Sequence, residues 1–188
     1  MNDRLTQALC AIDAANASDP NNKELTYSQR MTEGLFRLEK SPSEILQLAA
    51  RAQHIRRWDI PRNTYPAGRI GYLQWRTALY AHHAQITGEI LQTAGYDPST
   101  IQHVQHLLRK QGIKTDPEMQ SLEDVICLVF LQYELTPFAQ QQPAEKVIEI
   151  LRKTWKKMSA RGHAAALAQV LSLPVEIQSL VQAALSQP

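Results

Sequence analysis

Cysteine, long apolar runs and secretion signals are all scarce or missing in this chain. Its 188 residues include two cysteines, Cys10 and Cys127, which lie far apart. This usage argues against a disulfide framework or a closely spaced cysteine metal motif, and it is typical of reduced thiols. The most apolar stretch, 125–131, is too short to span a bilayer. Because the first residues carry acids and no apolar core, we expect no signal peptide, no membrane partner and a cytoplasmic location.

No stretch alternates apolar and polar residues in the way that a half-buried strand does. Helix-start signals are frequent instead, at Ser41-Pro42-Ser43-Glu44, Asp97-Pro98 and Asp116-Pro117. The sequence therefore predicts one all-α domain over 1–188, with about seven to nine helices. Its core is expected at about 23–138 and a C-terminal helical extension at 143–188. The clearest helices are predicted at 4–16, 23–39, 42–58, 70–93, 98–112, 117–135, 144–158 and 174–186.

Acids and lysines are nearly missing from residues 45–88, although the formal charge of the whole chain is only +2. This segment holds six arginines, one acid (Asp59) and no lysine, whereas the rest of the chain has eight lysines and six arginines. Arginines beside histidines and tryptophans are typical of bidentate phosphate or carboxylate recognition. The alternative is that they pair with acids on other helices. We predict a ligand-binding pocket from Gln53, His54, Arg57, Trp58, Arg62, Tyr72, Trp75, Arg76 and Lys110, with His83 beside it.

Buried polar side chains are expected on helices that are apolar nearly all round. Asp124 shares a stripe with Leu128 and Leu131, with Glu123 beside it. Such carboxylates either complement the dipole of their own helix or require a cation or a metal. His83 lies on the apolar stripe of the helix at 70–93, and His54 lies on another buried helix. The candidate metal ligands are His54, His83 and Asp124, with Glu123 as the alternate, for one divalent Zn, Mn, Fe or Ni ion. No catalytic residue is assigned.

Two other groups of cations are predicted to lie on the surface. The helix at 144–158 has a basic face, Arg152, Lys153, Lys156 and Lys157, opposite an apolar stripe. This face is either solvated or binds an acidic partner or a polyphosphate, and four cations are too few to predict nucleic-acid binding. His103 and His106 are expected on an exposed helix face.

The order of these groups resembles the HD-domain superfamily of metal-dependent phosphohydrolases. There, a His-Ser-x-Arg-Val helix precedes a helix ending in His-Asp, and later helices bring a histidine and an aspartate. The segment 27–31 (YSQRM) is similar to the first pattern, with tyrosine in place of histidine, and Gln53-His54 stands where His-Asp is expected. His83 and Asp124 match the later positions. The resemblance covers about 27–131 and implies an HD-like fold whose metal site is either rebuilt or lost.

A second resemblance, to an uncharacterised family described as a domain of unknown function (DUF4202), covers nearly the whole chain. It is carried by the strings QHIRRWDIPR, GYLQWRT, LEDVICLVFL and LRKTWKKMSARGHAAAL. It implies no activity. With the arginine cluster, we predict an HD-like protein that binds a phosphorylated small molecule or nucleotide, with metal-dependent phosphohydrolysis as its catalytic form. The alternatives are a non-catalytic ligand-sensing or partner-binding module and an HD-like metal-dependent oxygenase.

Overall fold

Helices account for all of the regular structure. The computed structural model describes residues 3–186, and within them there is no strand, which confirms the all-α prediction. Over the same residues, no helix combines the length and apolar character needed to cross a membrane. The elements are α1 (Asp3–Ala17), α2 (Glu24–Leu38), α3 (Glu44–Arg51), η1 (Arg57–Asp59), η2 (Arg62–Thr64), α4 (Gly68–Thr93), α5 (Pro98–Leu108), α6 (Pro117–Val129), η3 (Phe130–Glu134), α7 (Leu135–Ala139), α8 (Ala144–Lys157), α9 (Ala160–Val170) and α10 (Val175–Leu185).

The structure has ten α-helices in the part of the chain it describes, so the expected count of about seven to nine was too low. One reason lies in the helix expected at 117–135. A π-helical segment, η3, replaces part of that helix and separates α6 from α7. A π-helical segment uses wider i→i+5 hydrogen bonds, and the N–H of Leu135 accordingly donates to the carbonyl of Phe130.

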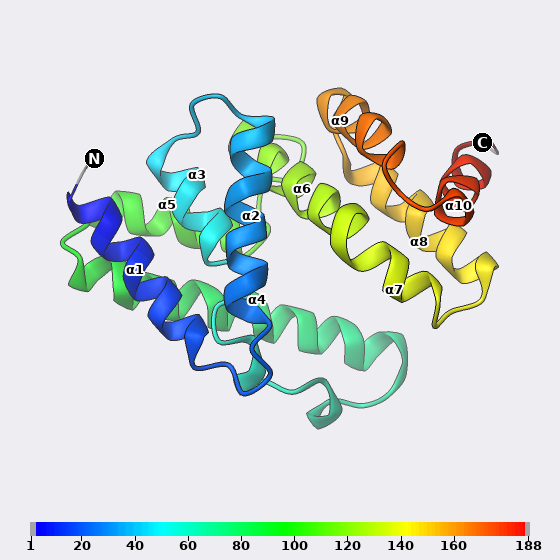
Figure 1. Cartoon of the computed structure of the whole chain (residues 1–188). Coiled ribbons are helices and arrows are strands. Elements are labelled where there is room, and N and C mark those ends of the chain that lie inside the picture. The colour runs from blue at the N-terminus through cyan, green and yellow to red at the C-terminus, as the bar shows by residue number, and fades with distance from the viewer. Residues whose placement is uncertain (1–2, 187–188) are drawn as a thin grey trace. The chain divides into compact units, whose positions relative to one another are not determined.

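The chain forms two compact units, Met1–Met119 and Gln120–Pro188. This division falls inside α6, whereas the sequence places the end of a core near 138. In the first unit, α4 packs on α5, α3 packs between α2 and α5, and α1 contacts α2, α3 and α4 (Figure 1). In the second unit, α8 packs on α10 and on α7, while α9 packs on η3.

The turn after α3 differs from the sequence prediction, which continues this helix to about Trp58. The helix ends at Arg51, and Arg56 adopts a left-handed conformation with φ of 48°. Non-glycine residues rarely adopt this conformation, because the side chain crowds the backbone. The N–H of Arg56 donates to Oδ1 of the buried Asn16 on α1, which holds the turn in place. His54 is therefore presented from a turn and not from a helix face.

The buried stripe of α4 is also shifted from the one expected. Leu79 and His83 are buried as predicted, but Tyr72 is 44% exposed. The stripe runs instead through Trp75, and it continues past His83 to Thr87. This register directs His83 toward the turn after α3, where its Nδ1 lies 2.8 Å from the carbonyl oxygen of Ile55.

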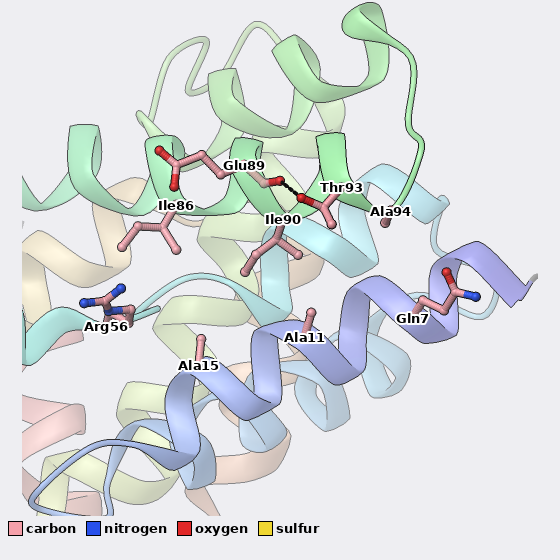
Figure 2. A pocket seen from close by; sticks show the side chains of 9 residues that line it. All are labelled: Gln7, Ala11, Ala15, Arg56, Ile86, Glu89, Ile90, Thr93 and Ala94. Carbon is pink, nitrogen blue, oxygen red and sulfur yellow. Dashed lines mark hydrogen bonds between the residues drawn. The ribbon is translucent and has the colours of Figure 1, made fainter.

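A cavity of about 440 Å³ lies within the first unit between α1 and α4. Figure 2 shows Ala11 and Ala15 of α1 facing Ile86 and Ile90 of α4 across it, with Arg56 nearby. None of the nine predicted ligand-binding residues lines this cavity. Its walls are mainly short or apolar side chains, so it does not present the convergent polar groups that the arginine-rich segment was predicted to supply.

Candidate anion-binding site

His54 is the centre of a polar cluster in the first unit. Its Nδ1 lies 3.2 Å from Oε2 of Glu24, and its Nε2 lies 3.0 Å from NH1 of Arg57. A guanidinium can only donate hydrogen bonds and a carboxylate can only accept them. The two partners therefore select one tautomer, in which Nδ1–H donates to Glu24 and Nε2 accepts from Arg57.

Helix α2 supplies both the acid and the aromatic support for this imidazole. The ring of Tyr27 stacks on the ring of His54, with centroids 3.8 Å apart and planes 9° apart. Glu24 and Tyr27 are three residues apart and so lie on one face of α2. The start of this helix is held by Asp19, whose Oδ2 accepts from the N–H groups of Lys23 and Glu24. Burial opposes ionisation of Asp19, but these backbone N–H groups lower its pKa below the ordinary value.

The charges of three cations, Arg57, Arg76 and Lys110, act on the imidazole of His54. Burial is the largest cause that lowers the pKa of His54 well below its usual range, followed by the charge of Arg57. The charges of Arg76 and Lys110 act in the same direction. Burial also lowers the pKa of Arg57, and Arg76 adds to that effect, whereas Glu24 opposes it. The side chain of His54 remains 24% exposed, so a dissolved ligand has access to it.

Aromatic rings border these cations. The guanidinium of Arg57 lies over the ring of Trp75, 4.8 Å from its centroid. Trp75 is held by its own Nε1–H, which donates to the carbonyl of Ile60. Tyr72 contacts Trp75 at 5.9 Å between centroids and is largely exposed. Stacking on Trp75 fixes the Arg57 plane, which is how an arginine presents two parallel donors to a phosphate.

His83 lies next to His54, with ring centroids 6.2 Å apart. Because a carbonyl oxygen only accepts, Nδ1–H of His83 donates to Ile55 and its Nε2 carries no proton. Burial, against the opposing effect of this hydrogen bond, lowers the pKa of His83 to about 3. Both histidines in the cluster are therefore neutral at pH 7, and its positive charge comes from Arg57, Arg76 and Lys110.

The backbone at Lys110 has an unusual conformation for a lysine. Lys110 follows the end of α5 with φ of 60°, and its N–H donates to the carbonyl of Leu107. Gln111 donates in turn to the carbonyl of His106. This is the left-handed position after a helix at which glycine is usual. A lysine at this position carries backbone strain, and the charge of its side chain acts on His54.

Three other arginines of the segment have partners within the protein, and one of them, Arg51, pairs with an acid on another helix as the alternative interpretation expected. Arg51 forms a two-pronged pair with Asp13, with Nε and NH2 2.6 and 2.5 Å from the two carboxylate oxygens. Arg56 pairs with Asp59 at 2.9 Å. Arg62, predicted as a ligand residue, donates to two backbone carbonyls of its own loop and lies farther from Trp75 than Arg57 does.

Two further predicted ligand residues are placed away from the histidine contacts. Gln53 is buried, and its Nε2 donates to the carbonyl of Ala49. Trp58 lies half-buried in η1. The argument that Gln53 and Arg57 share a helix face is wrong, because α3 ends before both of them. The structure nevertheless brings His54, Arg57 and His83 together, with Trp75 and Tyr72 at the border. Arg76 and Lys110 act on His54 through their charges, and the guanidinium of Arg76 donates to the hydroxyl of Tyr80.

The acids predicted as metal ligands have other partners within the second unit. Asp124 is fully buried, and its Oδ1 accepts from the N–H of Ser159 at 2.8 Å and from Nε2 of Gln120 at 3.1 Å. The hydroxyl of Ser159 donates to its other oxygen. Ser159 also caps α9, so Asp124 supports the start of α9 and not the dipole of its own helix. Hydrogen bonds thus satisfy this carboxylate, for which the sequence offered either the dipole of its own helix or a cation or metal as the partner.

Glu123 behaves as a buried carboxylate was predicted to, since Nζ of Lys157 lies 3.4 Å from its Oε1. Across residues 3–186, no three His, Cys, Asp or Glu side chains form a group that could hold a metal ion. The metal set of His54, His83 and Asp124 therefore gains no support from the geometry. A bound Zn, Mn, Fe or Ni ion stays a prediction for elemental analysis to test.

The two predicted surface groups are mostly paired. On the basic face of α8, Lys153 pairs with Glu149, and Nε of Arg152 donates to the carbonyl of Ala184. His103 lies 3.4 Å from Glu118 and is partly exposed. These contacts fit the solvated interpretation of both surfaces.

Two members of the cluster have weak signals in the sequence. Glu24 begins an ordinary amphipathic helix, and a carboxylate in the first turn is expected there for the helix dipole alone. Tyr27 was noted only because it replaces a histidine of the HD pattern. The three-residue spacing of Glu24 and Tyr27 could have placed them on one face of their helix, but only the fold brings His54 against that face.

A family model described as "Domain of unknown function (DUF4202)" matches residues 6–181. The chain belongs to this family. No curated protein and no solved structure matches the chain.

Proposed function

We propose that the protein binds a phosphorylated small molecule, with Arg57, Arg76 and Lys110 holding the phosphoryl group. The observation that carries this proposal is the position of Arg57, whose guanidinium lies over Trp75 and 3.0 Å from Nε2 of His54, with the charges of Arg76 and Lys110 also acting on that imidazole. Three cations act on His54 while Glu24 contacts its Nδ1, and both histidines are neutral, so the charges that act on this imidazole are mainly positive. That positive charge matches the dianion of a phosphate monoester better than a single carboxylate.

The organic part of the ligand is expected on the aromatic border. Tyr72 is exposed beside Trp75, and a flat ring, such as the base of a nucleotide, stacks favourably on such side chains. Arg57 is itself stacked on Trp75, so the organic part and the phosphoryl group of the ligand would bind to adjacent surfaces.

The arrangement also supports the HD-like expectation. Tyr27, His54 and His83, three positions of the HD pattern, lie together in the first unit. Asp124, the fourth, belongs to the second unit and is hydrogen-bonded to Ser159. We therefore propose an HD-like binding unit whose phosphate contacts come from guanidinium and ammonium groups of the chain.

The test is calorimetric titration of pyrophosphate into the wild-type protein and Arg57→Ala. Loss of a charged hydrogen-bond donor is expected to weaken binding about 10- to 100-fold. Arg57→Lys should recover only part of this loss, because an ammonium does not form the parallel pair of bonds. Arg69→Ala is the matched control, since this exposed arginine at the start of α4 carries the same charge. Equal losses in Arg57→Ala and Arg69→Ala would reduce the effect to net charge and overturn the proposal.

A further inference from the structure

The imidazole of His54 is held in the arrangement of a nucleophile. Glu24 accepts from Nδ1–H, Tyr27 fixes the ring plane by stacking, and the Nε2 lone pair faces the guanidinium of Arg57. An acid that orients an imidazole and stabilises positive charge on it is the same relation found in nucleophile–base–acid arrangements. The binding proposal does not explain why Glu24 and Tyr27 hold the His54 ring in a fixed orientation, since a cation site alone has no need of an oriented histidine.

We infer that His54 accepts a phosphoryl group on Nε2 from the bound ligand, forming a covalent phosphohistidine. This inference rests on the proposed phosphate site. A phosphate oxygen that binds Arg57 takes the donor now shared with Nε2, which leaves the lone pair facing the phosphorus. Since NH1 and Nε2 are 3.0 Å apart, the phosphorus of such a ligand would lie near Nε2, within reach of the roughly 3–3.5 Å of an attack geometry.

The steps balance without a redox partner. The Nε2 lone pair forms the N–P bond, the P–O bond to the leaving group breaks, and the electron pair leaves on that oxygen. The ring keeps its Nδ1 proton and becomes cationic, and Glu24 compensates that charge. Water then attacks phosphorus, the N–P bond breaks, its electron pair returns to Nε2, and one proton passes to solvent. The products are the leaving group, inorganic phosphate and the original neutral His54.

The charges around His54 favour this role over that of a general base. A general base would end as an imidazolium among three cations, with only Glu24 to offset it. A phosphorylated ring carries a dianionic phosphoryl group, which Arg57, Arg76 and Lys110 stabilise. The best donors are compounds whose leaving group is already a weak base, because no acid has been placed to protonate it. Acyl phosphates are such a class.

The experiment incubates the full-length protein with acetyl phosphate and maps labelled peptides by mass spectrometry under alkaline conditions that preserve phosphohistidine. The expected result is one phosphoryl group on His54, none in His54→Ala, and labelling about 100-fold slower in Glu24→Gln. His106→Ala, which removes a partly exposed histidine of α5, should label like the wild type. Direct mapping on the wild type keeps the test valid even if His54→Ala fails to fold.

The outcomes separate the two proposals. If pyrophosphate binds and loses affinity in Arg57→Ala but His54 acquires no label, the phosphohistidine inference is overturned and the binding site stands. Label on His106 or on lysines in place of His54 has the same meaning. If pyrophosphate does not bind at all, the proposed function itself fails.

Discussion

Lys110→Gly should make the protein more stable and its ligand binding weaker. Lys110 occupies a left-handed position, with φ of 60°, where glycine is the usual residue. That conformation costs a non-glycine residue about 1–2 kcal/mol, and the greater freedom of glycine in the unfolded chain cancels about 0.5–1 kcal/mol of the gain. The substitution should therefore raise the free energy of unfolding by up to about 1.5 kcal/mol.

Ligand affinity should move in the opposite direction. The ammonium of Lys110 is one of three cations that act on His54, and Lys110→Gly removes that positive charge. One lost charged contact to a phosphate is worth about 1.5–3 kcal/mol, or roughly 10- to 100-fold in affinity. Urea denaturation followed by circular dichroism gives the first quantity, and pyrophosphate calorimetry gives the second.

Lys114 offers a matched control for this experiment. It is also left-handed, with φ of 72°, and it is exposed, so Lys114→Gly relieves the same strain and removes the same charge. This control should gain stability and keep its affinity. If Lys110→Gly binds pyrophosphate as tightly as Lys114→Gly, Lys110 does not belong to the site. If it loses stability while Lys114→Gly gains it, Lys110 supports the fold through contacts that outweigh its backbone strain.

Three other predictions concern the framework around the site. Asp124→Ala should lower the free energy of unfolding by roughly 3–5 kcal/mol, because it leaves the buried donors of Ser159 without their acceptor, whereas the exposed Glu145→Ala should cost less than about 1 kcal/mol. Gly162→Ala should cost about 1–3 kcal/mol in the same denaturation assay, since its Cβ would lie 2.6 Å from the Asp124 carboxylate, and the exposed Ala164→Ser is the control. The free energy of unfolding should also fall as the pH is lowered, because His83 stays neutral in the folded state down to about pH 3 but protonates below about pH 6.5 when unfolded. Between these pH values the wild type should lose up to about 1.4 kcal/mol per pH unit more than His83→Gln. A small effect of Asp124→Ala would refute the role of its hydrogen bonds, and a tolerated Gly162→Ala would refute the close approach of Gly162 to Asp124. Equal pH slopes would refute the role of His83 in the loss of stability at low pH.

Local signals in the sequence predicted the helices well where capping chemistry marks their starts. Asp97 caps α5 as expected, whereas α3 is capped by Ser43, two residues after the Ser41 cap that the sequence indicated; each cap accepts from a backbone N–H three residues on. The end of α3 was placed too late, because the left-handed turn at Arg56 depends on a hydrogen bond from its N–H to Oδ1 of Asn16, about forty residues earlier. A tertiary contact of this kind leaves no periodic signal.

The candidate site was only partly predictable, because tertiary contacts bring several of its residues together. Arginine in place of lysine indicated Arg57 and Arg76, and the apolar stripe of α4 indicated His83. Composition could not distinguish Arg57 from Arg51, whose partner Asp13 lies on α1. Glu24 and the capping role of Asp124 depend on which helix faces them, and the sequence carries no direct sign of that.

The most direct test of the central claim is calorimetric titration of pyrophosphate into the wild-type protein after treatment with a metal chelator. The claim is that the cations of the chain, led by Arg57, hold the phosphoryl group next to His54. It predicts saturable binding at one site that survives chelation and weakens as salt is added. Absence of binding, or binding that returns only when a divalent metal is restored, would contradict it.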